Sequence, residues 1–248
     1  MEKSVALLLL TVALIVATSC GQGSGPTASQ LNDSPSPQAG DSTLYGLACD
    51  GCNDTVLVYL PLPYDDRDPD TLNILEASRQ GHVYGQLRIG DKLVIVRNSQ
   101  DTAVADMVVS TNALQGEWCF RVKPTLRLRP DGSHLQLNDS LRRLLEVERE
   151  YGFIIKPDSQ VFPKGFGGAA RTSDDASDIV YPAPRRYRRW AVSNGRLLLS
   201  EAIIDSVGTV KTMTVDTASF VRLTADTLVL RFCDGEHEYY RKAEEAAE

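Results

Sequence analysis

The sequence lacks the short motifs that mark the common enzyme classes. It contains no Gly-x-Ser-x-Gly nucleophile turn, no phosphate-binding loop and no Gly-x-Gly-x-x-Gly run. Its three histidines, His82, His134 and His237, are isolated, and none stands at a metal-ligand spacing from another. These absences predict a protein that is not an enzyme and that uses no cofactor and no metal.

The sequence also lacks an excess of basic residues. Its 26 Lys and Arg are outnumbered by 33 Asp and Glu, which gives a net charge of −7. Nucleic-acid binding depends on clustered Lys and Arg that displace the counterions of phosphates, so a nucleic-acid partner is excluded. With 42% apolar and 24% charged residues, the chain has an ordinary globular composition and is long enough for two modest domains.

No apolar run is long enough to cross a membrane as a helix. The longest, Val5 to Ala17, holds about 13 residues where a spanning helix needs about 20. Lys3 precedes the run, and the small residues Thr18 and Ser19 follow it. This pattern predicts that residues 1–19 are a cleaved signal peptide.

The next stretch, Ala17-Thr18-Ser19-Cys20, resembles the lipobox of bacterial lipoproteins. The resemblance implies that Cys20 becomes the acylated N-terminus and that acyl chains bind the protein to a membrane. Gly21 stands where some Gram-negative lipoproteins carry the aspartate associated with inner-membrane retention, so we expect the outer membrane, on its periplasmic or surface face. Residues 20–43 contain one large apolar side chain, Leu31, which predicts a lipidated flexible tether.

Four cysteines remain after Cys20. In an exported protein an even number favours disulfides, so Cys49 and Cys52 form a candidate disulfide, with a free surface pair as the alternative. A redox pair would need a helix after the first cysteine, and none is predicted there. A zinc site would require Cys119 and Cys233 to meet this pair across two domains.

Residues 44–112 show a pattern of short strands. Thr55 to Leu62 is a nearly continuous apolar run, and Ala105 to Val109 is another. His82 to Ile89 and Lys92 to Arg97 flank Gly90-Asp91, which predicts a hairpin. We therefore expect a small β domain here, a barrel or a sandwich.

Residues 113–243 predict an antiparallel meander with one inserted helix. The helix is expected to be capped by Asn138 or Asp139 and to end at Gly152. Asn194-Gly195 is the strongest hairpin signal, and three further turns follow, at Val207-Gly208, Ala225-Asp226 and Asp234-Gly235. Closing such a meander removes its exposed edges, which favours a barrel over an open sheet, with 244–248 as a short tail.

Gly116-x-Trp118, the meander and Tyr239-Tyr240-Arg241 resemble the lipocalin-like domains of lipoproteins in the Gram-negative envelope. The resemblance covers about residues 113 to 243, and the whole chain resembles two-part lipoproteins of this kind. It implies that an arginine of the last strand packs over the first-strand tryptophan and closes the barrel by a cation–π contact. That arginine would be Arg241, with Arg231 as second choice.

The one basic and aromatic cluster contains Arg186, Arg188 and Trp190, which share a face if the segment is a strand. Arg186 and Arg188 are therefore candidates for contact with an anionic group at the barrel mouth. The alternative is that the arginines of this cluster pair with the upstream acids Asp174, Asp175 and Asp178.

Two functions remain open at this point. A closed barrel of about eight strands can enclose a small apolar or amphipathic ligand. Alternatively, the chain is a non-enzymatic interaction module of an envelope complex, with a barrel packed solid. Six large side chains decide between them by where they point: Leu197, Leu199, Phe220, Leu228, Leu230 and Phe232.

Overall fold

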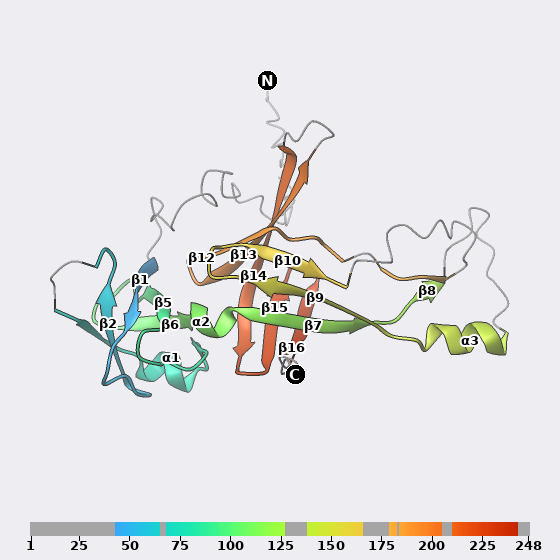
Figure 1. Ribbon diagram of the computed structural model, residues 1–248. Helices are drawn as coiled ribbons and strands as arrows, with labels where there is room; N and C mark the ends of the chain where they lie inside the picture. Colours follow the sequence, from blue (N-terminus) through green and yellow to red (C-terminus); the bar gives the residue numbers. More distant parts are fainter. Residues whose placement is uncertain are drawn as a thin grey trace, which may run out of the picture.

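The computed structural model describes residues 43–64, 68–126, 138–165, 179–182, 184–204 and 210–242. The signal peptide, Cys20, the tether up to residue 42, the loop with Asp174, Asp175 and Asp178, the turn Val207-Gly208 and the tail 244–248 lie outside these residues. The described chain is mainly β, as predicted. Figure 1 shows a first β unit on one side of a central barrel and a narrow arm on the other.

The first unit is a single six-stranded sheet. Its strands lie in the order β3 (Asp70–Asn73), β2 (Val56–Pro61), β1 (Thr43–Ala48), β5 (Lys92–Arg97), β6 (Ala105–Ser110) and β4 (Val83–Tyr84). All neighbours are antiparallel except β4 and β6. A bridge between Asn73 and Val104 brings the β3 edge back to the start of β6. The sheet therefore curls on itself beside the short helix α1 (Leu75–Arg79), and of the two predicted architectures the sandwich is wrong.

Two predictions for this unit need correction. The tether was expected to include Thr43, but β1 begins there, and buried Thr43 accepts a hydrogen bond from Asn194 N at 2.8 Å. The hairpin around Gly90-Asp91 is also wrong, because β4 pairs with β6 and not with β5. After Tyr84 the chain turns aside to the second unit, where Gly85 N donates to Leu223 O at 3.1 Å.

The second unit is an eight-stranded antiparallel sheet. Its order is β10 (Val161–Lys164), β9 (Arg149–Ile155), β7 (Gly116–Val122), β16 (Gly235–Arg241), β15 (Thr227–Phe232), β14 (Val210–Leu223), β13 (Arg196–Ile204) and β12 (Arg189–Ser193). The two edges meet where Val161 N donates to Arg188 O at 2.8 Å and Trp190 N to Ser159 O at 2.9 Å. The sheet is thus nearly closed, and the prediction of a barrel rather than an open sheet is confirmed.

The tight turns of the meander follow the residues that predicted them. Asn194 and Gly195 have φ angles of 48° and 70°, the left-handed pair that a two-residue hairpin with the right twist requires. They join β12 to β13. Short turns at Ala225-Asp226 and next to Gly235 join β14 to β15 and β15 to β16.

The inserted helix is shorter than predicted. α3 spans Asp139–Leu145 and begins as expected, since the Asn138 side chain accepts a hydrogen bond from Leu141 N at 2.8 Å. It ends well before Gly152, so that residue is not its stop signal. From Arg149 the chain is β9, because Tyr151, Phe153 and Ile155 alternate toward the core with the period of a strand.

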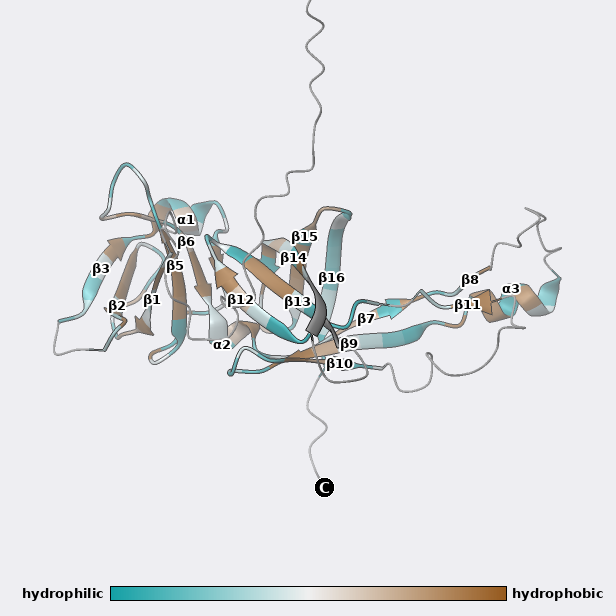
Figure 2. Ribbon diagram, turned by 90° about the horizontal axis from the view of Figure 1, so that it is seen from above, coloured by the Kyte–Doolittle hydropathy of each residue, from teal (hydrophilic) through white to brown (hydrophobic). Residues whose placement is uncertain are grey.

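α3 lies at the end of the arm, away from both sheets (Figures 1 and 2). The arm contains a short antiparallel pair, β8 (Thr125–Leu126) with β11 (Ile179–Val180). No residue of α3 is buried, and Leu144 is 52% exposed. Within the described segments, no helix combines the length and the apolar character that crossing a membrane requires.

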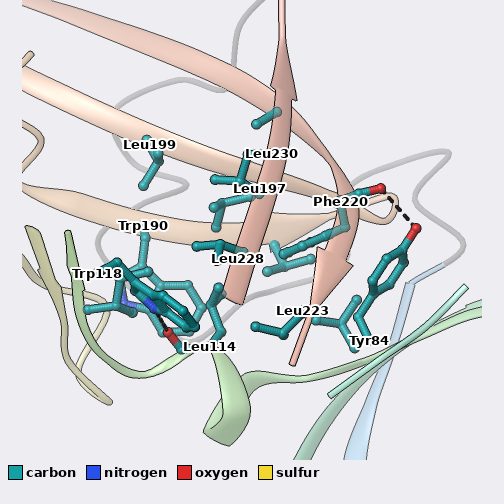
Figure 3. Packing of buried hydrophobic residues seen from close by; sticks show 14 of the residues in the cluster. Tyr84, Leu114, Trp118, Trp190, Leu197, Leu199, Phe220, Leu223, Leu228 and Leu230 are labelled. Atoms are coloured by element: carbon teal, nitrogen blue, oxygen red, sulfur yellow. Dashed lines mark hydrogen bonds between the residues drawn. The ribbon is translucent and has the colours of Figure 1, made fainter. Parts of the chain in front are cut away.

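The first unit packs against one end of the barrel. The expected boundary at residues 112 and 113 falls inside α2 (Thr111–Leu114), which leads directly into β7. The Tyr84 hydroxyl donates to Phe220 O at 2.8 Å (Figure 3), and the Tyr45 hydroxyl donates to Val192 O at 3.0 Å. One hydrophobic cluster joins residues of both units, among them Tyr84, Val94, Val109, Leu114, Trp118 and Phe220.

Candidate functional site

The end of the barrel next to the first unit is closed by Trp118 and Arg241. Trp118 is fully buried and its indole N–H donates to Leu114 O at 2.8 Å. The Arg241 guanidinium lies 4.2 Å from the centre of a Trp118 ring, so the contact that the family resemblance implied is present. Its nitrogens also donate to three carbonyls, of Gln115, Ala113 and Ala225. Arg231, the second choice, instead pairs with Glu236 at 2.6 Å.

Gly116 makes room for this closure. Its φ of +121° lies in a region that residues with a side chain rarely adopt, and a Cβ at this position would collide with the guanidinium of Arg241. Glycine is therefore needed at position 116 for steric reasons. It lets Arg241 reach both the Trp118 ring and the carbonyls of the α2 turn.

The half of the barrel near this end is packed solid. Five of the six large side chains that were to decide the matter are at most 5% exposed. Figure 3 shows them meeting Trp118 and Trp190 in one continuous core. They are Leu197, Leu199, Phe220, Leu228 and Leu230.

The opposite half is open. Phe232, the sixth large side chain, is partly buried and lines a pocket of about 550 Å³ at the far end of the barrel. This volume is within the range of about 300 to 1,000 Å³ that is usual for small-molecule sites. The pocket is lined by Phe120, Val122, Gly152, Phe153, Pro182, Pro184, Arg185, Tyr187, Val215, Asp216, Thr217, Phe232, Cys233, Asp234, His237 and Tyr239.

Aromatic rings form one wall of the pocket. Tyr239 lies edge-on to Phe120 and to Phe153, with ring centres 5.5 and 5.1 Å apart. These residues come from the neighbouring strands β16, β7 and β9. Burial raises the pKa of the Tyr239 hydroxyl, and the charges of Asp234 and Asp216 raise it further, so the hydroxyl is protonated at neutral pH.

Two carboxylates with side-chain partners lie beside this wall. Asp216 accepts hydrogen bonds from Arg185 Nη1 at 2.6 Å and from the Tyr187 hydroxyl at 2.7 Å. Burial and the Asp216 carboxylate raise the pKa of Tyr187. On the other side, Asp234 Oδ1 lies 3.0 Å from His237 Nε2.

Asp216 is one of the pocket residues that the sequence-based reasoning missed. It stands two residues before Ala218 and four before Phe220, both of which are buried in the barrel core. A carboxylate in register with inward apolar residues of one strand is the signal that would have identified it.

Arg186 and Arg188 do not occupy the predicted place at the mouth. Both are exposed and neither lines the pocket. The prediction assumed a strand from residue 186, but β12 begins only at Arg189. Tyr187 and Trp190, three residues apart, both pack toward the barrel core, which breaks the two-residue period. The arginine that lines the pocket is Arg185, and its partner is Asp216.

Cys49 and Cys52, the candidate disulfide pair, are both free thiols in this structure. The Cys52 thiol donates to Val58 O at 3.1 Å and accepts from Val58 N at 3.4 Å, which holds it against β2.

Cys119 is buried, and burial raises its pKa to about 11. The described part of the chain contains no group of three or more His, Cys, Asp or Glu that could hold a metal ion.

No protein-family model, no curated protein and no solved structure matches this chain. Function is therefore inferred from the geometry of the pocket.

Proposed function

We propose that the chain binds a small apolar or amphipathic ligand in the open half of the barrel and catalyses no reaction. The observation that carries this proposal is the pocket of about 550 Å³, with an aromatic wall and a few fixed polar groups. Sites for small molecules combine these features, because apolar walls supply affinity and a few polar groups set orientation.

The same observation weighs against the alternative of a solid barrel that serves only as an interaction module. Large side chains fill the half next to the first unit, where Trp118 and Arg241 close the base. The other half, from Phe120 and Val122 outward, is not filled by side chains of the described residues.

Narrowing the pocket should weaken binding. Val122 lies two residues beyond Phe120 on β7 and lines the pocket, so the Val122→Trp variant places an indole where the ligand would lie. We expect at least a tenfold loss of affinity for an apolar fluorescent probe such as N-phenyl-1-naphthylamine. The measurement is a fluorescence titration of the full chain.

The matched control is Arg121→Trp, one residue earlier on the same strand, where the side chain is 67% exposed and points outward. Its affinity for the probe should stay within about twofold of the unmodified chain. Equal affinities for the probe in both variants and the unmodified chain would show that the probe does not enter this pocket.

We also propose that the protein is anchored to the outer membrane through acyl chains on Cys20. This proposal rests on the apolar run from Val5 and on the Ala17-Thr18-Ser19-Cys20 stretch. An anchor of two or more acyl chains is needed for stable attachment, since a single chain binds only weakly and reversibly.

Replacing the acylated residue should release the protein. A Cys20→Ser variant, expressed in a Gram-negative host, is expected to lose incorporation of labelled palmitate and to move from the membrane fraction to the soluble fraction. Membrane fractionation with palmitate labelling measures both effects. Continued labelling of the variant would contradict acylation at this residue.

A further inference from the structure

We propose that the ligand carries a protonated amine on an apolar body, and that the Tyr239 hydroxyl is the polar anchor for that amine at the pocket wall. The inference deepens the proposed function and rests on it, because it names the chemical class of the molecule that the pocket takes.

Tyr239 provides the first observation. Its side chain is only 6% exposed and it lines the pocket. Over the described segments, no residue forms a hydrogen bond with its hydroxyl, whereas the nearby Tyr187 hydroxyl is bound by Asp216. The hydroxyl oxygen is not fully buried, so it can be reached from the pocket. A ligand group in the pocket can therefore form a hydrogen bond with it.

The charges that face the pocket provide the second observation. The lining carries two carboxylates, Asp216 and Asp234, against one arginine, Arg185, and one histidine, His237. Arg185 is bound directly to Asp216 at 2.6 Å, so its charge is already balanced. Among the described residues, the partner of Asp234 is His237, which is charged only when protonated.

The pKa shift of the Tyr239 hydroxyl agrees with the excess of carboxylates in the pocket lining. Burial raises the pKa of its hydroxyl most, and the charges of Asp234 and Asp216 raise it further. The two carboxylates therefore favour a cation beside the hydroxyl and disfavour a carboxylate or phosphate.

The aromatic rings of the pocket also suit an amine on an apolar body. Phe120, Phe153 and Phe232 line it together with Tyr239, and the faces of aromatic rings attract cations in a partly dry site. An ammonium group can donate to the Tyr239 oxygen and lie near the Asp234 carboxylate, while its apolar body covers the rings.

Two probes of one shape and opposite charge test the inference. 1-Naphthylmethylamine and 1-naphthylacetate share the same ring system and differ in the charge of the short side group. Isothermal titration calorimetry of the full chain at pH 7 should show at least tenfold tighter binding of the amine. Equal affinities, or tighter binding of the acetate, would overturn the proposal.

Two variants locate the effect. Tyr239→Phe removes only the hydroxyl and should weaken the amine about tenfold while changing the acetate less than twofold. Asp234→Asn, at a side chain 67% exposed, should reduce the preference for the amine severalfold without affecting folding. If neither variant changes the ratio of the two affinities, the amine does not lie at this wall.

The same titrations separate this inference from the proposed function. If both probes bind equally and Val122→Trp weakens both, the pocket binds ligands and the amine specificity is wrong. If neither probe binds the full chain at millimolar concentration, the amine ligand is excluded. If the apolar probe N-phenyl-1-naphthylamine also fails to bind, the proposed function is contradicted as well.

Discussion

Replacing Trp118 with alanine is expected to lower the free energy of unfolding by about 3 to 5 kcal/mol, the usual cost of removing a buried large aromatic side chain. Trp118 is fully buried, and its N–H is bound to Leu114 O. The variant also removes the ring under Arg241, a contact worth about 0.5 to 2 kcal/mol. Urea denaturation followed by circular dichroism measures the change.

The matched control is Phe162→Ala, at an aromatic residue 43% exposed on β10 of the same barrel. Its effect should stay below about 1 kcal/mol, because much of that ring already contacts water. A loss of less than 1 kcal/mol for the Trp118 variant as well would contradict the role of this residue in closing the barrel.

Replacing Tyr84 with alanine is the second large effect, again expected at about 3 to 5 kcal/mol. Tyr84 belongs to the first unit, yet its ring lies 5.3 Å from that of Phe220 and its hydroxyl donates to Phe220 O in the barrel. The variant leaves a cavity between the two units and removes the partner of a buried carbonyl. Urea denaturation measures the loss.

Urea denaturation of the unmodified chain also tests whether the two units unfold together. Because one core joins them, the unmodified chain should show a single transition by circular dichroism and by tryptophan fluorescence, whose two reporters, Trp118 and Trp190, both lie in the barrel. The control Tyr64→Ala, at a side chain 49% exposed, should shift the midpoint little. Two separate transitions in the unmodified chain would contradict the shared core.

The sequence correctly predicted a turn and a helix cap that depend only on neighbouring residues. Asn194-Gly195 forms its hairpin because both residues adopt positive φ, and Asn138 caps α3 through its own side chain. The hairpin at Gly90-Asp91 was wrong for a tertiary reason. Tyr84 and Gly85 bond to β14 of the barrel, which takes that segment away from β5. No pattern within ten residues of Gly90 carries that information.

The candidate site was predicted less well than the barrel that holds it. Its residues come from several strands, so their meeting depends on the register of the whole sheet. The arginine pattern was misread because the strand starts at Arg189 and not at Arg186. Trp118 and Arg241 were identified only through a family resemblance, since they are far apart in the chain and pair across β7 and β16.

The measurement that tests the central claim most directly is native mass spectrometry of the full chain, purified gently from cells and compared with the same sample after denaturation. A ligand in the open half of the barrel predicts a stoichiometric adduct that leaves on denaturation, with the mass of an amphipathic amine. A clean apo mass that persists after incubation with an envelope lipid extract would contradict ligand binding and favour a protein partner instead.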